Sequence, residues 1–111
     1  MPADRTDVFT TEDQHLAQLA KALAHPARIA ILRILAQRKS CVCGELVELM
    51  PLAQATVSQH LRELKEAGLI QGSIDGPRVC YCLHPAGLRR LREGFAALFE
   101  EVVAPDSSSC C

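Results

Sequence analysis

The sequence lacks a long apolar run. No apolar stretch approaches the ~18 residues that a membrane-spanning helix needs, and the polar start at residues 1–7 has no apolar core of the kind found in a secretory signal. We therefore expect a cytoplasmic protein without a membrane partner, in which the six cysteines are thiols or metal ligands and not structural disulfides. The 111 residues are the length of one small domain, which a subunit interface would help to stabilise.

The sequence also lacks the patterns of an enzyme. It shows no set of nucleophile, base and orienting residue, and it has no glycine-rich loop for a phosphate group. We therefore expect no enzymatic activity.

Acidic residues are absent between Asp13 and Glu45, although the net charge of the whole chain is −1. Segregation of this kind can give a nearly neutral protein one basic face, as a nucleic-acid-binding protein needs. Ordinary solvated helix faces explain the same charges equally well. The basic residues in the interval are Lys21, Arg28, Arg33, Arg38 and Lys39.

Apolar spacing, proline and glycine divide the chain into a flexible arm (residues 1–10), a folded domain (11–104) and a flexible tail that ends in two cysteines (105–111). The helix predicted to follow Pro26 is apolar around most of its circumference, so we expect it to be largely buried. The predicted helices span residues 11–23, 26–37, 44–49, 53–66 and 85–103; an extended piece is expected at 40–42, with strands at 69–73 and 79–83 and a turn at 74–78.

The predicted order, α-α-β-α-α-β-β-α, is that of a winged helix-turn-helix: a mainly α domain with a small β-hairpin. The apolar stripe of the last helix includes Phe95, Leu98 and Phe99. A soluble monomer rarely leaves a patch of this size in water. We therefore expect a homodimer formed by the first and last helices.

Two segments carry a family resemblance. Residues 19–28 read LAKALAHPAR and residues 55–70 read ATVSQHLRELKEAGLI. Both resemble the arsenic-repressor (ArsR/SmtB) family of bacterial regulators, and the similarity covers roughly residues 14–100. The resemblance implies a homodimeric repressor that binds double-stranded operator DNA and releases it when it binds its ion.

The fourth predicted helix is the expected DNA reader. Val57, Leu61 and Leu64 form its inward stripe, and His60 beside them is expected to be a semi-buried structural residue. The opposite face then points outward; a solvated face paired with neighbouring glutamates is the alternative for Arg62. The predicted DNA contacts are Gln54, Ala55, Thr56, Ser58, Gln59 and Arg62, with Arg78 at the tip of the hairpin.

Two cysteines precede the third predicted helix. Cys41 and Cys43 match the pair that arsenic-sensing members carry at this place, so the resemblance implies As(III) or Sb(III) as inducer. Thiolates suit soft metal ions in general, so another soft metal remains an alternative. The family's best-known pattern has a further cysteine where this sequence has Leu46. A third sulfur must therefore come from elsewhere.

The hairpin offers that sulfur. Cys80 and Cys82 lie at i and i+2 of one strand and face the same side of the sheet. In winged-helix folds the extended piece pairs with this strand, which would bring Cys41 or Cys43 within ~5 Å at Cβ of Cys82 or Cys80. Simple burial as small hydrophobic residues is the alternative for the two hairpin cysteines.

The tail offers a second source. Cys110 and Cys111 could chelate an ion, but ordering the tail would cost ~1–2 kcal/mol per fixed residue. An inert tail is the alternative. A zinc site on the last helix is not expected, because residues 85–103 contain no histidine.

These patterns predict a repressor that leaves its operator when thiolates bind trivalent arsenic or antimony. One alternative is a repressor of the same fold that responds to thiol oxidation. A different class is a cytosolic metal-buffering or interaction protein that does not bind DNA.

Overall fold

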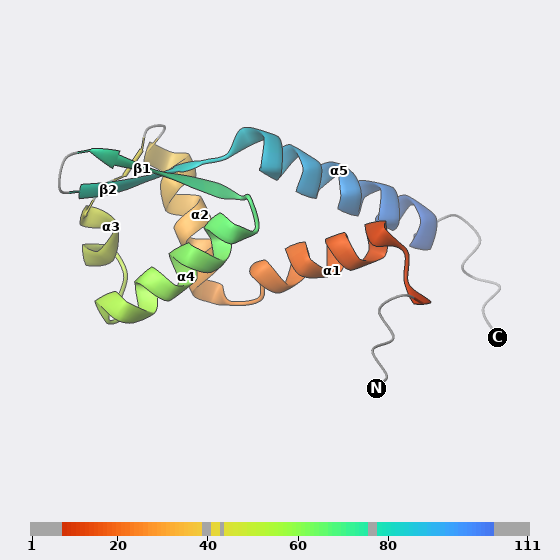
Figure 1. Cartoon of the computed structure of the whole chain (residues 1–111), viewed down its shortest axis with the longest axis horizontal. Helices are drawn as coiled ribbons and strands as arrows, with labels where there is room; N and C mark the ends of the chain where they lie inside the picture. The colour runs from red at the N-terminus through yellow and green to blue at the C-terminus, as the bar shows by residue number, and fades with distance from the viewer. Residues whose placement is uncertain (1–7, 39–40, 43, 76–77, 104–111) are drawn as a thin grey trace.

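The computed structural model describes residues 8–38, 41–42, 44–75 and 78–103. The predicted winged helix-turn-helix with its small hairpin is confirmed (Figure 1). Most of the expected arm (residues 1–7) and the expected tail lie outside the described residues. No described helix has the length and apolar character needed to cross a membrane. The elements are α1 (Thr11–Ala22), α2 (Pro26–Arg38), α3 (Glu45–Glu48), α4 (Gln54–Glu66), β1 (Ile70–Asp75), β2 (Arg78–Leu83) and α5 (Pro85–Val102).

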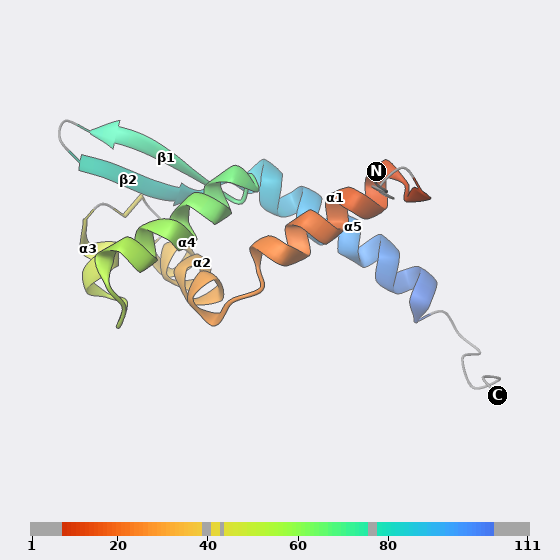
Figure 2. The same cartoon turned by 60° about the horizontal axis from the view of Figure 1, so that its bottom comes forward.

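The elements form two groups. Helices α2, α3 and α4 gather with the hairpin into what we call the head, where α2 contacts α4 and β2. Helices α1 and α5 contact each other and project from the head as what we call the extension (Figure 2). The hairpin lies along α4 on one side of the head, and α3 lies at the end of the head farthest from the extension.

The hydrophobic core lies mainly in the head. Ile31 of α2, Leu64 of α4 and Leu69 before β1 are 0% exposed. The predicted inward stripe of α4 is confirmed, because Val57, Leu61 and Leu64 are all buried. This stripe fixes which face of α4 is left for solvent.

The prediction that α2 is largely buried is wrong for part of its surface. Ala27, Ile31 and Leu35 are buried, but Ile29 remains 36% exposed. The core contacts one face of α2, and the elements that the structure describes leave the side of Ile29 partly in solvent.

Side-chain caps fix the starts of three helices. Thr10 Oγ1 accepts a hydrogen bond from the Asp13 amide at the start of α1 (3.0 Å). His25 and His84, each followed by a proline, act similarly before α2 and α5, where Nδ1 accepts from the Ala27 and Gly87 amides (3.0 Å each). Such caps satisfy amides that have no partner within the helix.

The sheet is an antiparallel hairpin that runs from the Ile70–Leu83 pair to the Asp75–Arg78 pair. Each strand is one residue longer than predicted, so residues 74, 75 and 78 of the predicted turn belong to the strands, and residues 76–77 lie outside the described residues. Val42 joins β2 through two hydrogen bonds with Tyr81, N to O at 2.8 Å and O to N at 2.9 Å. The predicted pairing of the extended piece with β2 is therefore confirmed.

A close glycine contact joins α5 to the head. Gly68 follows α4 with φ of 80°, a left-handed conformation that suits glycine at a helix end. A Cβ atom on Gly87 would collide with the Gly68 carbonyl. The start of α5 therefore packs directly on the backbone that ends α4.

Candidate DNA-reading surface and thiol site

The outward face of α4 carries polar side chains. Arg62 Nη1 donates a hydrogen bond to Gln59 Oε1 (3.3 Å), so these two side chains lie together on the surface. The outward orientation predicted for this face is confirmed. The exposed residues are Gln54, Ala55, Thr56, Ser58, Gln59 and Arg62.

The first turn of α4 is suited to a phosphate group. Ala53 is the N-cap and provides no side-chain hydrogen bond, and the first turn holds no acidic residue. The backbone amides and the positive end of the helix dipole can therefore face an anion. Arg78 begins β2 at the hairpin end, where the sequence placed it.

His60 lies on the inner side of α4 and is more deeply buried than the predicted semi-buried residue, with 6% of its surface exposed. Its Nδ1 accepts a hydrogen bond from Arg28 Nε (3.1 Å), and its ring lies 4.3 Å from that of His25. Burial lowers the pKa of His60 from the ordinary 6.5, and electrostatic interaction with His25 and with Arg28 lowers it further, against a smaller opposite effect of Glu63. The neutral imidazole is therefore favoured.

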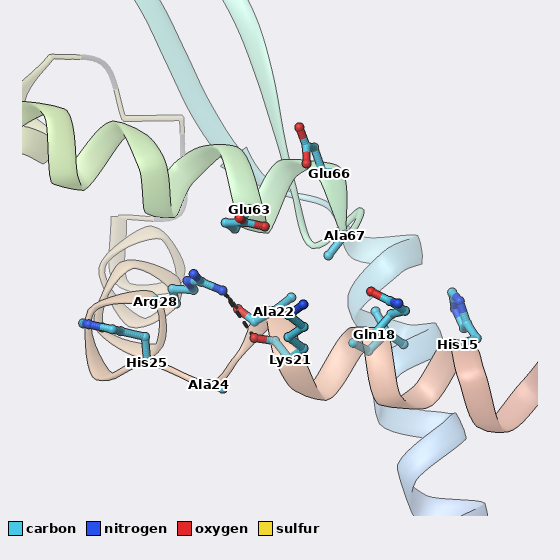
Figure 3. A pocket seen from close by; sticks show the side chains of 11 residues that line it. His15, Gln18, Lys21, Ala22, Ala24, His25, Arg28, Glu63, Glu66 and Ala67 are labelled. Carbon is cyan, nitrogen blue, oxygen red and sulfur yellow. Dashed lines mark hydrogen bonds between the residues drawn. The ribbon is translucent and has the colours of Figure 1, made fainter. Parts of the chain in front are cut away.

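Arg28 joins three elements, a structural role that the sequence did not reveal. Besides His60, it reaches the end of α1, where its Nη1 donates to the carbonyls of Lys21 (3.3 Å) and Ala22 (3.2 Å) (Figure 3). Arg28 is half-buried and belongs to no exposed basic face. One signal was present: a cation in the first turn of α2, with no acid there, opposes the helix dipole.

A cleft of about 660 Å³ lies beside Arg28. His15, Gln18 and Lys21 of α1 line one wall, and Glu63 and Glu66 of α4 line the other (Figure 3). Helices α1 and α4 thus lie on opposite sides of the cleft, and Arg28 lies at one end of it.

The structure brings two predicted thiol-site residues together. Cys41 and Cys82 form a disulfide, with Cα atoms 4.4 Å apart across 41 residues of sequence, so the expectation that the cysteines form no disulfide is wrong for this pair. The cause is the Val42–Tyr81 bridge, which sets Cys41 beside Cys82 in an antiparallel register. Cys80 is also disulfide-bonded and is only 4% exposed.

The remaining predicted ligands are not described. Cys43, Cys110 and Cys111 lie outside the described residues. Leu46, at the position of the family's further cysteine, is 2% exposed and belongs to the core. Within the described parts of the chain, no three His, Cys, Asp or Glu side chains gather around a possible ion.

The fold is that of a winged helix-turn-helix protein. Helix α4 buries one apolar stripe, α2 and α3 precede it, and the hairpin of β1 and β2 follows it. A helix-turn-helix domain model matches residues 23–72. The transcriptional repressor SmtB of Mycobacterium tuberculosis H37Rv is 46% identical over 66 residues, which cover 60% of this chain and 48% of that protein. The regulator CmtR of the same organism is 34% identical over 96 residues, which cover 86% of this chain and 78% of that protein.

Solved structures agree with these relatives. A possible transcriptional regulator for arsenical resistance has a TM-score of 0.65 and 32% identity, covering 81% of this chain and 96% of that one. A homodimeric winged helix-turn-helix domain from Mycobacterium bovis has a TM-score of 0.64 and 25% identity, covering 90% of each chain. The chain belongs to the ArsR/SmtB family of transcriptional regulators. It spans about half the length of the SmtB relative.

Proposed function

We propose that this protein is a cytoplasmic transcriptional repressor that leaves its operator when its thiols bind trivalent arsenic or antimony. The observation that carries the proposal is the Cys41–Cys82 contact, which ties the segment before α3 to the hairpin. We call Cys41, Cys43, Cys80 and Cys82 the thiol cluster. The names of the SmtB relative, a repressor, and of the arsenical-resistance neighbour support the two parts of the proposal.

DNA binding is proposed for the exposed face of α4. Glutamine and serine side chains recognise base edges in the major groove, and Arg62 is suited to a guanine or a phosphate. The uncapped first turn of α4 favours a phosphate as well. The proposed contacts are Gln54, Ala55, Thr56, Ser58, Gln59 and Arg62, with Arg78 on the wing.

A second copy of the chain is proposed to cover the extension. Phe99 is 56% exposed and Val102 is 61% exposed, although both are large and apolar. The first half of α5 carries three arginines (89, 90 and 92) against the single acid Glu93, whereas Glu100 and Glu101 lie near its end. A two-fold dimer that pairs α5 in an antiparallel manner would set these opposite charges against each other. The homodimeric neighbour supports this arrangement.

Trivalent arsenic and antimony suit a site of three thiolates. Cys41 and Cys82 fit two of these positions once a cellular dithiol reductant supplies two electrons and two protons and converts their disulfide to two thiols. The antiparallel register at Val42 and Tyr81 keeps these thiols side by side. Cys43, two residues from Cys41, or Cys80, two residues from Cys82, is proposed as the third. The tail pair, Cys110 and Cys111, is the less favoured source because it must first be ordered.

Release of DNA follows from where the thiol cluster lies. The segment of Cys41 leads into α3, the first helix of the helix-turn-helix, and Cys82 lies on the wing. Three sulfurs bound to one ion lie farther apart than the two sulfurs of a disulfide, so ion binding changes the spacing between the segment before α3 and the wing, and with it how α3 and α4 sit relative to the wing. A preference of ~1.4 kcal/mol for the DNA-incompetent arrangement would weaken DNA binding tenfold.

X-ray absorption of the arsenite complex tests the site. We expect three sulfur neighbours per arsenic in the wild type, two or fewer in Cys41→Ser/Cys82→Ser, and three in a chain that ends at Ser109. Retention of three sulfurs in the double variant would overturn the site assignment. Loss of one sulfur in the truncated chain would move the third ligand to the tail.

The disulfide itself favours a second candidate function, a repressor controlled by oxidation. Peroxide would take two electrons and two protons from the Cys41 and Cys82 thiols, which gives one disulfide and two waters. Titrating promoter DNA complexes with arsenite under reducing conditions, and separately with peroxide, distinguishes the candidates. Release by peroxide alone would favour the oxidation switch. A wild-type protein that binds no promoter DNA at low salt would support a metal-buffering role instead.

A further inference from the structure

Arg28 occupies a position that local helix energetics do not explain. It lies in the first turn of α2, where its positive charge faces the positive end of the helix dipole. A residue that breaks a local rule is expected to serve another purpose in the structure. The partners of its guanidinium indicate what that purpose is.

The guanidinium connects the extension to the recognition helix. Nη1 donates hydrogen bonds to the carbonyls of Lys21 and Ala22, which lie at the negative end of the α1 dipole. Nε donates a hydrogen bond to His60 Nδ1 on the inner face of α4. The planar fork of arginine makes these bonds in fixed directions, so moving one partner displaces the others. Beside this bridge, a cleft lies between α1 and the second half of α4 (Figure 3).

We propose that Arg28 and His60 form a latch that positions the recognition helix α4 against the end of α1. The latch makes Arg28 and His60 positioning residues for DNA reading, although neither contacts the exposed face of α4. The second copy is proposed to bind the extension. Through the latch, a displacement of α1 in the extension changes the orientation of α4. This inference rests on the proposed DNA-binding role of α4.

The latch requires neutral His60. Nδ1 accepts the hydrogen bond from Arg28, and a protonated ring would instead present an N–H to a cation. The charged groups around His60 are His25 before α2, Arg28 on α2 and Glu63 on α4. Since the net effect of burial and these charges is to lower the pKa of His60, acid opens the latch only below the ordinary value of 6.5.

The test compares operator affinity among variants by fluorescence anisotropy, with duplexes from the promoter upstream of the protein's own gene. His60→Phe keeps a ring but removes the acceptor, whereas His60→Asn offers an oxygen in the place of Nδ1. Arg28→Lys keeps the charge but loses the fork. The matched control is Arg33→Gln, an exposed arginine of the same helix.

We expect His60→Phe and Arg28→Lys to weaken binding about five- to tenfold, a typical size for coupling between sites. The operator affinity of His60→Asn should lie within about twofold of the wild type. The affinity of Arg33→Gln should fall only by the amount expected for the loss of one positive charge. Between pH 8 and 5, wild-type affinity should fall below pH 6.5 more steeply than that of His60→Asn. Sedimentation and circular dichroism establish that each variant is folded and keeps the wild-type association state.

Two results would overturn the latch. One is equal affinity of wild type, His60→Phe and Arg28→Lys. The other is a loss in His60→Asn as large as in His60→Phe, with the same pH profile as the wild type, because only the ring and not its acceptor would then matter. Failure of the wild type to bind any promoter DNA would instead overturn the proposed function, and with it the role of the latch in DNA reading. Nitrogen NMR of His60 is the second measurement, and a protonated Nδ1 at pH 7.5 would contradict the latch whatever the DNA result.

Discussion

The head and the extension bury their apolar side chains differently. In the head, Ile31, Leu64 and Leu69 are 0% exposed within a single chain. In α5 of the extension, Gly87 is the buried residue, while Phe99 and Val102 remain more than half exposed. The head therefore buries its core within one chain, whereas α5 leaves large apolar side chains in water, as is typical of a surface that a partner covers.

The largest effect is expected in the head. Ile31→Ala should lower the free energy of unfolding by ~2–5 kcal/mol, because it leaves a cavity in a fully packed core. Ile29→Ala, in the same helix but 36% exposed, should cost under ~1 kcal/mol. Urea denaturation at fixed protein concentration measures both. Equal losses would contradict the one-sided burial of α2.

The extension should respond through association. Phe99→Glu places a charge on the exposed apolar face and should weaken dimerisation at least tenfold, ~1.4 kcal/mol or more. Sedimentation velocity at micromolar concentration measures the shift toward monomer. Leu52→Glu is the matched control, since Leu52 is a 37% exposed leucine of the head. A dimer unaffected by Phe99→Glu, or disrupted equally by Leu52→Glu, would mean that the interface lies elsewhere.

The junction between head and extension should tolerate little added volume. Gly87→Ala should destabilise the protein by ~1–3 kcal/mol, because the new methyl group meets the Gly68 carbonyl. At Gly94 the obstacle is the end of the Leu16 side chain, which can move. Gly94→Ala should therefore cost less, and the better helix propensity of alanine offsets part of that cost. Thermal unfolding should give a higher melting temperature for Gly94→Ala than for Gly87→Ala. The reverse order would contradict the close contact between Gly87 and the Gly68 carbonyl.

The smallest effect is expected at the start of the extension. Thr10→Ala removes the cap of α1 and should cost ~1 kcal/mol. Thr11→Ala, one residue later and exposed within the helix, should be neutral or slightly stabilising. Denaturation curves of the two variants should separate by about that amount. If they coincide, Thr10 does not act as the cap in solution.

The sequence predicted the order of elements and the inward stripe of α4, because periodicity encodes burial directly. It predicted that thiols of the extended piece and the hairpin meet, but it left the pairing open. The Val42–Tyr81 register, which joins Cys41 to Cys82, is a tertiary property. The same holds for the bonds of Arg28, whose partner His60 is distant in sequence. The exposed side of α2 was missed because an apolar helix does not reveal how many neighbours it has.

The central claim is that the thiol cluster controls DNA binding by the head. The most direct measurement is arsenite titration of a fluorescent promoter duplex bound to the reduced protein, for the wild type and for Cys41→Ser/Cys82→Ser. We predict that arsenite weakens the DNA affinity of the wild type at least tenfold and releases it from the duplex. Without arsenite, the variant should bind DNA as tightly as the wild type does. Arsenite should leave the DNA affinity of the variant unchanged. Release of the variant at the same arsenite concentration, or a wild type that stays bound, would contradict the claim.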